Sequence, residues 1–137
     1  MARQKAVVDA SVLVKWFVDE QGSTDALRLQ EDHLAEKLRI IVPELSFIEV
    51  INALRYKGGA AETLAAANRA LWDCQFHVEK ITELLLDKTA MLAVQHNLSM
   101  YDALYLAIAM LHNCALITAD KKLARTPNAI QLSMMKH

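Results

Sequence analysis

The sequence predicts an α/β fold in which a central parallel β-sheet is flanked by helices. Short runs of apolar and β-branched residues, typical of buried strands, lie at residues 5–9, 39–42 and 115–118, with weaker candidates at 76–81 and 129–132. Longer segments with helical spacing of apolar residues separate them. Strands that alternate with helices in this way form parallel sheets covered on both faces. A length of 137 residues and a hydrophobic content of 54% suit a single domain, residues 1–137.

Caps and breakers mark where the helices begin and end. Ser11 can cap the segment that follows the first strand, and Gly22 interrupts that segment. Pro43 favours a helix start after the second strand, whereas Gly58 and Gly59 end that helix. Helices are therefore expected at residues 12–18, 24–38, 44–57, 60–74 and 82–96, in a segment that Asp102 opens, and as a short turn at 121–124.

Charge and hydropathy exclude several classes of protein. A net charge of −1 argues against a protein that coats nucleic acid non-specifically, because such proteins are usually strongly basic. A nucleic-acid enzyme needs only a local basic groove. The longest apolar run, residues 103–111, is far shorter than the roughly 20 residues that cross a bilayer. The N-terminus lacks the apolar core of a signal peptide. We therefore expect a soluble, cytoplasmic protein with no membrane partner.

The cysteines and histidines do not form a metal-binding motif in the sequence. Cys74 and Cys114 are isolated, and we expect both to be reduced thiols in the core. None of the five histidines lies four residues from another, and no pair of cysteines has the spacing of a zinc ligand motif. A zinc site is therefore not expected from the sequence.

Four acidic residues occupy positions where a simple surface charge is not expected. Asp9 and Asp120 each follow an apolar strand, so their side chains should lie in the crevice at the carboxyl ends of the strands. Asp102 opens a helix that is apolar on nearly every side. Glu49 shares its expected inward helix face with Leu45, Ile48, Asn52, Ala53 and Tyr56. Each acid also has a simpler explanation, namely a cap or turn for the aspartates and a solvent-facing position for Glu49.

These simpler explanations do not account for four carboxylates at one end of the sheet. Buried carboxylates that lie together repel one another unless a cation joins them. Oxygen ligands without histidine or thiolate favour Mg²⁺ or Mn²⁺. Such ions bridge carboxylates to phosphates and activate water, so the pattern predicts hydrolysis of phosphodiester bonds.

Four segments of the chain resemble the PIN-domain family, and most of all the toxin of a VapBC toxin–antitoxin pair. They read VVDASVLVKWF, VPELSFIEVINAL, SMYDALYLAIA and LITADKKLA, at residues 7–17, 42–54, 99–109 and 116–124. Together they span nearly the whole chain in the family's order. The resemblance implies an α/β/α sandwich around a parallel sheet and an endoribonuclease that depends on Mg²⁺ or Mn²⁺.

The resemblance places the acidic quartet of the family on Asp9, Glu49, Asp102 and Asp120, and none of the four is substituted. We expect Asp9 and Asp102 to coordinate the metal directly. Glu49 and Asp120 would bind through water, hold a second metal or orient the attacking water, and the sequence leaves these alternatives open.

Three polar residues are expected to support the quartet. Ser11 and Thr118 match polar positions that often accompany it in the family. Thr118 alternates with Asp120 along its strand, so its hydroxyl can bond a carboxylate or a ligand water. Strand packing and helix capping explain Thr118 and Ser11 equally well. Asn52 lies one turn after Glu49, from where its side chain can reach the site.

The resemblance also predicts partners, namely an RNA substrate, a second copy of the chain in a homodimer, and an antitoxin protein that places a helix in a groove. Large apolar residues in the early and middle helices are candidates for either core or interface: Val12, Trp16, Phe17, Tyr56, Leu71 and Trp72. Basic residues near the motifs are candidates for contact with the RNA backbone: Lys15, Arg55, Lys57, Lys121, Lys122 and Arg125.

Other α/β classes fit this sequence less well. A phosphotransfer receiver domain needs an acidic pair near the first strand, and a phosphatase with an aspartyl nucleophile needs an aspartate where Ser11 stands. A stronger alternative is a PIN domain that keeps its acids but turns over poorly, and acts as an RNA-binding or protein-interaction module.

Overall fold

A computed structural model describes residues 3–135 and contains a five-stranded β-sheet. The strands are β1 (Gln4–Val8), β2 (Leu38–Pro43), β3 (His77–Glu79), β4 (Ala115–Thr118) and β5 (Ala129–Gln131). Their order across the sheet is β3-β2-β1-β4-β5, and every adjacent pair is parallel. The α/β class and the central parallel sheet predicted from the sequence are therefore confirmed.

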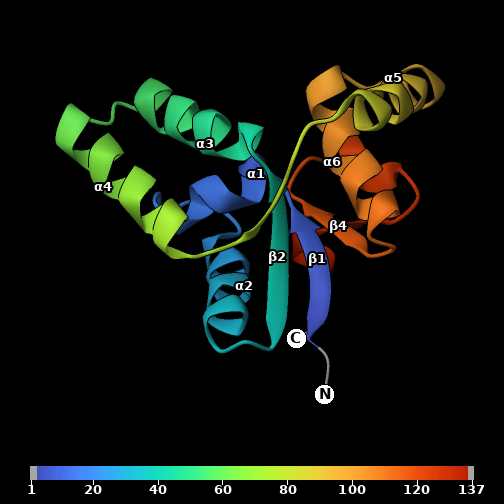
Figure 1. Cartoon of the computed structure of the whole chain (residues 1–137). Coiled ribbons are helices and arrows are strands. Elements are labelled where there is room, and N and C mark those ends of the chain that lie inside the picture. The colour runs from blue at the N-terminus through green and yellow to red at the C-terminus, as the bar shows by residue number, and fades with distance from the viewer. Residues whose placement is uncertain (1–2, 136–137) are drawn as a thin grey trace.

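Helices cover both faces of this sheet (Figure 1). Within the described residues they are α1 (Ala10–Leu13), α2 (Ser23–Leu34), α3 (Leu45–Tyr56), α4 (Ala61–Asp73), α5 (Glu83–His96) and α6 (Met100–Leu111), with short 3-10 turns η1 (Val14–Trp16), η2 (Leu123–Arg125) and η3 (Leu132–Met134). In Figure 1, α1 to α4 lie on one side of the sheet, and α5 and α6 lie on the other. The α/β/α sandwich implied by the family resemblance is therefore present.

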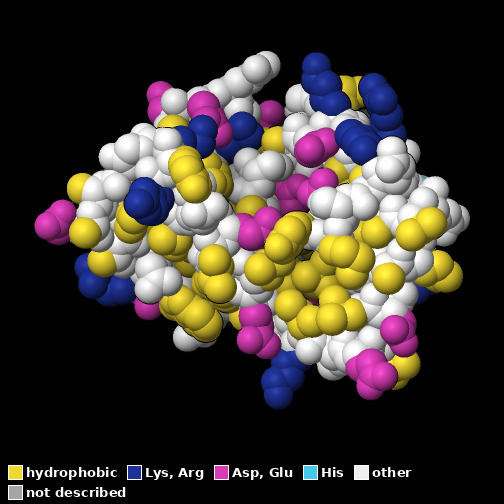
Figure 2. All heavy atoms as spheres, turned by 90° about the horizontal axis from the view of Figure 1, so that it is seen from above, with side chains coloured by type: hydrophobic (Ala, Val, Ile, Leu, Met, Phe, Trp, Pro, Cys, Tyr) yellow, Lys and Arg dark blue, Asp and Glu magenta, His cyan; other side chains and the backbone are white. Residues whose placement is uncertain are grey.

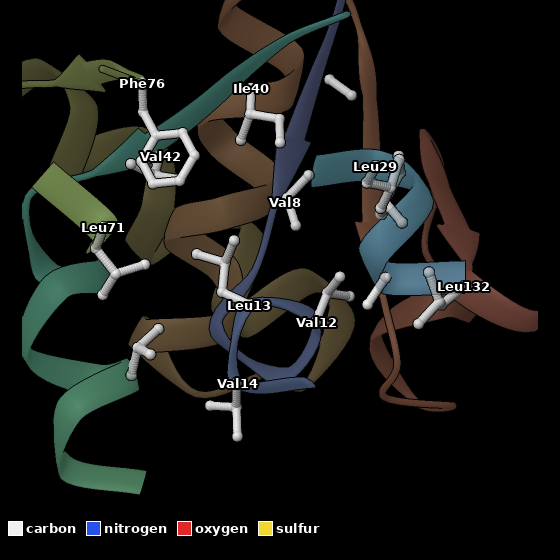
Figure 3. Packing of buried hydrophobic residues seen from close by; sticks show 14 of the residues in the cluster. Val8, Val12, Leu13, Val14, Leu29, Ile40, Val42, Leu71, Phe76 and Leu132 are labelled. Carbon is white, nitrogen blue, oxygen red and sulfur yellow. The ribbon is translucent and has the colours of Figure 1, made fainter. Parts of the chain in front are cut away.

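The strands contribute alternate side chains to two apolar layers. Val8, Ile40 and Val42 pack in the layer that contains α1 to α4, part of which is drawn in Figure 3. Val7 and Ile41 face the opposite layer, which contains α5 and α6. Since both faces are covered, the strands are apolar along their length and do not alternate with polar residues.

The order of the strands creates a crevice beside β1. The chain passes from β1 to β2 on one side, and returns with β4 to the other side of β1. Ligands of open α/β sheets usually bind at such a reversal, outside the carboxyl ends of the strands. Val8 is paired with Ile117, and the Asp9 N–H donates to the Ile117 carbonyl at 3.2 Å. Both strands therefore deliver their following residues to the same crevice.

The most buried helix is α6, in which every residue from 103 to 109 is buried. This agrees with a sequence that is apolar on nearly every side of the helix. The helix packs between the sheet and α5. None of the helices between residues 3 and 135 is long and apolar enough to span a bilayer.

The first helix differs from the prediction in both its cap and its length. The segment expected at residues 12–18 divides into α1 and the 3-10 turn η1. Its N-cap is Asp9, whose carboxylate accepts the Val12 N–H at 3.3 Å, and not Ser11. The hydroxyl of Ser11 instead donates to the Asp9 carboxylate and accepts the Ala119 N–H.

Two further boundaries were predicted wrongly. The helix expected at residues 24–38 ends at Leu34, because residue 38 already belongs to strand β2, in which residues 38–41 pair with β1. Helix α6 begins at Met100, before Asp102, because the Ser99 hydroxyl accepts the Asp102 N–H at 3.1 Å and caps the helix. Asp102 thus lies inside the first turn, and its carboxylate is not used as the cap.

Candidate metal centre

The crevice collects acidic side chains from segments that are far apart in the sequence. Asp9 directly follows β1, and Asp120 lies two residues beyond β4. Figure 2 looks onto this end of the molecule and shows acidic side chains in the middle of the face, with Lys and Arg side chains nearby and a broad hydrophobic area beside them. The two aspartates thus follow the prediction that strand ends deliver them to one edge of the sheet.

Asp9 is buried, with 4% of its surface exposed, and both of its oxygens accept hydrogen bonds. The Ser11 hydroxyl donates to Oδ1 at 2.6 Å, and the Thr118 hydroxyl donates to Oδ2 at 2.5 Å. Each hydroxyl in turn accepts a backbone N–H at 3.0 Å, from Ala119 and Asp120 respectively. The carboxylate is therefore held in one orientation by groups from both β1 and β4 segments, and the predicted bond from Thr118 to a carboxylate is present.

Burial raises the pKa of Asp9 from an ordinary value of 3.8 to about 6. The negative charge of Asp102 adds to this increase, whereas the hydrogen bonds from Ser11 and Thr118 oppose it. A carboxyl group whose charged form is disfavoured by its surroundings gains stability from a cation placed beside it.

Asp102 interacts through its charge with each of the other three acids. Burial raises its pKa first, the charge of Asp120 raises it further, and Lys122 lowers it. Its charge in turn raises the pKa of Asp9 and of Glu49. The four acids therefore belong to one electrostatic unit with Asp102 at its centre.

Asp120 is exposed, and its carboxylate caps the turn that follows it, which is the simpler explanation considered from the sequence. Its Oδ1 accepts the backbone N–H groups of Lys122 and Leu123 at 2.8 and 3.0 Å. Capping occupies one oxygen of the carboxylate and orients the other. Capping and a contribution to the crevice are therefore compatible in this residue.

Glu49 is half-buried on α3 and is held by a residue that the sequence did not single out. The Tyr105 hydroxyl donates to Glu49 Oε1 at 2.7 Å and lies 2.9 Å from the Ser46 hydroxyl. Burial raises the pKa of Glu49, the bond from Tyr105 lowers it, and the charge of Asp102 raises it. Tyr105 follows Asp102 by three residues on the same helix face, and this spacing was the available signal.

The expected inward face of α3 was only partly right. The buried stripe of this helix is Phe47, Val50 and Leu54, together with Ser46. Ile48 and Tyr56 are 70% and 81% exposed. The sequence pattern is ambiguous because apolar residues occur on more than one side of the helix, and contact with α4 and the sheet selects which side is covered.

Asn52 lies on the exposed side of α3, in a groove between α3 and α4 of about 610 Å³. Its neighbours in that groove include Phe47, Ile48 and Trp72. Within residues 3–135 its side chain makes no hydrogen bond to Glu49 or to another acid of the crevice. Its supporting role stays a prediction.

The acidic crevice suits a divalent cation by the chemistry of its donors. All four acids offer hard oxygen ligands, and none forms a salt bridge within the described part of the chain. Within residues 3–135, no three of the four acids bring one ligand oxygen each to within 4.8 Å of one another. An octahedral ion such as Mg²⁺ usually keeps several bound waters and needs only one or two carboxylates as direct ligands.

Comparison with known proteins places these features in a family. The family model described as PIN domain matches residues 6–129. Ribonuclease VapC3 of Pyrobaculum aerophilum is 33% identical over 126 residues, which cover 88% of this chain and 92% of the relative. A crystal structure of a Pyrobaculum aerophilum protein has a TM-score of 0.67 and 29% identity, and the match covers 97% of this chain and 92% of that one. A toxin–antitoxin complex from Klebsiella pneumoniae has a TM-score of 0.73 at 21% identity over 95% and 99% of the two chains, which supports the fold.

Proposed function

The chain belongs to the PIN-domain family, and we propose that it is a Mg²⁺- or Mn²⁺-dependent endoribonuclease that hydrolyses phosphodiester bonds of RNA. The proposed site is formed by Asp9, Glu49, Asp102 and Asp120. One observation carries the proposal: a buried carboxylate, oriented on both oxygens, lies at the strand reversal and is coupled by charge to the other acids. The relative named a ribonuclease supplies the class of reaction.

The residues of the crevice have distinct tasks in this mechanism. When bound, Mg²⁺ or Mn²⁺ supplies Lewis acidity for the phosphate and lowers the pKa of a water molecule. Asp9 and Asp102 would hold the ion, and the hydroxyls of Ser11 and Thr118 keep Asp9 in a fixed orientation. Tyr105 engages only Oε1 of Glu49, which leaves Oε2 to accept a proton from the attacking water. Asp120 contributes the fourth carboxylate, from the turn that leads into η2.

Basic side chains near the crevice would contact the RNA backbone. Lys122 lowers the pKa of Asp102 through its charge, and we expect it to contact a phosphate bound beside Asp102. Lys15 and Lys57 are less suitable, because both form salt bridges with Glu20, at 3.2 and 3.1 Å. The candidates for contact with the RNA backbone are therefore Arg55 and the basic residues that follow β4, beginning with Lys122.

We further propose that the chain is the toxin of a toxin–antitoxin pair that acts in the cytoplasm. The groove between α3 and α4 is lined by Ile48, Ile51, Leu64 and Trp72 and could receive the apolar face of a partner helix. Val12 and Leu71, which were interface candidates, lie in the core. Loss of antitoxin co-purification in an Ile48→Lys variant would test the groove.

A homodimer is proposed on similar grounds. Leu84, Met91 and Val94 are exposed on α5, which forms the outer layer beside α6. Apolar groups gathered on one outer helix favour contact with another protein surface. The molecular mass of the untagged protein in solution, measured for wild type and Val94→Lys, tests this part of the proposal.

The competing function is a PIN domain that binds RNA or protein but cleaves poorly. Cleavage of a mixed RNA pool, with and without Mg²⁺ or Mn²⁺, separates the two. We expect metal-dependent cleavage by wild type, loss of cleavage in Asp9→Asn, and unchanged cleavage in Asp87→Asn. Asp87 is a matched control because it is an exposed aspartate on α5, outside the crevice. RNA binding without metal-dependent cleavage would favour the binding module, and equal cleavage by both variants would refute the site.

A further inference from the structure

A second group of ligating side chains lies outside the acidic crevice. His77 and Glu79 belong to edge strand β3, and His112 follows the last residue of α6. One ligand atom from each lies within 4.8 Å of the other two. No other such group occurs among the described residues. The cluster has two imidazoles and one carboxylate, a donor set that differs from that of the acidic crevice.

Local structure explains how the three residues meet. His77 and Glu79 are separated by one residue in a strand, so their side chains lie on the same face. The His112 N–H donates to the Ile108 carbonyl at 3.0 Å and ends α6, after which Asn113 has a φ of 51° and turns the chain away. The rings of His77 and His112 meet edge to face, with centroids 5.1 Å apart.

Contacts within the cluster are close, yet one ring nitrogen has no hydrogen bond. His77 Nε2 lies 3.2 Å from Glu79 Oε2, and His112 Nε2 lies 3.3 Å from Glu79 Oε1. The contact to His112 lacks hydrogen-bond geometry, and its Nε2 is an enclosed polar atom without a hydrogen-bond partner in the described structure. A buried polar atom left without a partner costs free energy, so something should satisfy it.

The spacing within the cluster suits ligands around one small ion. Zinc binds imidazole nitrogen and carboxylate oxygen at about 2.0–2.2 Å, so tetrahedral ligands stand roughly 3.3–3.5 Å apart. His77 Nε2 lies 3.2 Å from Glu79 Oε2, close to this range, and His112 Nε2 lies 3.3 Å from the other oxygen of the same carboxylate, Oε1. We propose that His77, Glu79 and His112 form a zinc-binding site, with water as the fourth ligand. The side chains of His77, Glu79 and His112 are 38%, 19% and 17% exposed, so the cluster lies near the surface of the protein.

A bound ion would cross-link the edge of the sheet to the end of α6. Strand β3 is short and pairs only with β2, so it has few hydrogen bonds of its own. A shared ion would join it to a residue 35 positions later in the chain. Asp102 lies at the opposite end of α6, about 15 Å away along the helix at 1.5 Å per residue. The proposed zinc site therefore lies apart from the proposed nuclease site.

The test is zinc uptake by untagged protein, measured by competition with a chromogenic chelator. We expect wild type to bind one equivalent of Zn²⁺ and to gain at least about 5 °C in Tm when it is saturated. His77→Gln and His112→Gln should each weaken binding by more than about 100-fold, since loss of an outer partner of a ligand already costs 10–100-fold. His96→Gln is the matched control, because His96 is a half-buried histidine at the end of α5 outside the cluster.

The same measurement on Asp102→Asn identifies which site holds the zinc. Retained uptake in Asp102→Asn and lost uptake in the two histidine variants support the proposal. The reverse pattern would assign the zinc to the acidic crevice and overturn it, as would the absence of uptake by wild type at micromolar free zinc. Failure of wild-type uptake says nothing about RNA cleavage, so the two proposals fail separately.

A measurement on wild type alone covers the case in which the histidine variants do not fold. Nitrogen-15 spectra of the histidine rings should show that one equivalent of zinc shifts the coordinating nitrogens of His77 and His112. The ring of His33 is occupied by the Cys74 carbonyl and the Ile40 N–H, at 2.7 and 3.2 Å, and should not respond. Zinc-induced shifts at His33 or His96 in place of the cluster would contradict the site.

Discussion

The acidic crevice lies at the carboxyl ends of the central strands β1 and β4, whereas the histidine cluster joins the edge strand β3 to the far end of α6. Both gather side chains from separated segments. The crevice offers only oxygen donors, which favour Mg²⁺ or Mn²⁺, and the cluster offers two nitrogens with one carboxylate, which favour zinc. The two proposed sites therefore differ in donor chemistry and in their position on the sheet, and we expect them to bind different ions.

The two regions also differ in charge balance. In the crevice, the charge of Asp102 raises the pKa of both Asp9 and Glu49, and no salt bridge within the described residues compensates it. In the cluster, one carboxylate faces two imidazoles. Electrostatic effects on stability should therefore arise mainly in the crevice. Three experiments test this contrast.

The largest effect is expected from Asp102→Asn, which removes the charge at the centre of the crevice. We expect RNA cleavage in Mg²⁺ to fall by about 1,000-fold, at the upper end of what one preorganised charged group contributes. Zinc uptake by the same variant should equal that of wild type. A parallel loss of cleavage and zinc uptake would mean that the two regions are one centre, and the contrast would fail.

The second effect is a pH dependence of stability in metal-free protein. Asp9 has a pKa of about 6 when folded and an ordinary value of 3.8, so below 3.8 its carboxyl group is protonated in both the folded and unfolded chain. Between pH 3.8 and pH 6 the unfolded chain releases this proton while the folded chain retains it. The free energy of unfolding therefore falls over this range, by at most about 3 kcal/mol, and the loss is complete above pH 6. The raised pKa values of Glu49 and Asp102 act in the same direction.

Urea unfolding between pH 4 and pH 7, in the presence of a chelator, measures this loss. Asp9→Asn should flatten the profile, and Asp87→Asn should leave it unchanged. Saturating Mg²⁺ should also reduce the loss, because a bound cation favours the charged carboxylates. A wild-type profile that rises over this range would show that the crevice does not control stability.

The smallest effect is expected from Tyr105→Phe, which removes one hydroxyl between Ser46 and Glu49. The change leaves the buried Ser46 hydroxyl without this partner, so the free energy of unfolding should fall by about 1–2 kcal/mol. Cleavage should fall by about tenfold through loss of the bond that orients Glu49. The pH dependence of cleavage should shift as well. If Tyr105 had a purely structural role, the variant would lose stability without that shift.

The sequence predicted the four acids as a candidate set and the bond from Thr118 to a carboxylate, but it did not predict the contact of Tyr105. The site itself stays a prediction. Asp9 and Asp120 follow strands of a parallel sheet, and that topology alone brings strand ends to one edge. Tyr105 was not found, because its bond to Glu49 depends on how α3 and α6 approach each other. The α3 face was assigned wrongly for Ile48 and Tyr56, since an apolar pattern does not say which side of a helix another element will cover.

Apolar periodicity and strand ends are properties of neighbouring residues, and they predict the α/β class, the buried strands and the places of the four acids along the chain. Packing between distant segments places the Thr118 hydroxyl on Asp9, couples Asp102 by charge to the other acids, and brings His112 to His77 and Glu79. Those contacts join residues up to 109 positions apart, and their geometry is set by packing across the sheet.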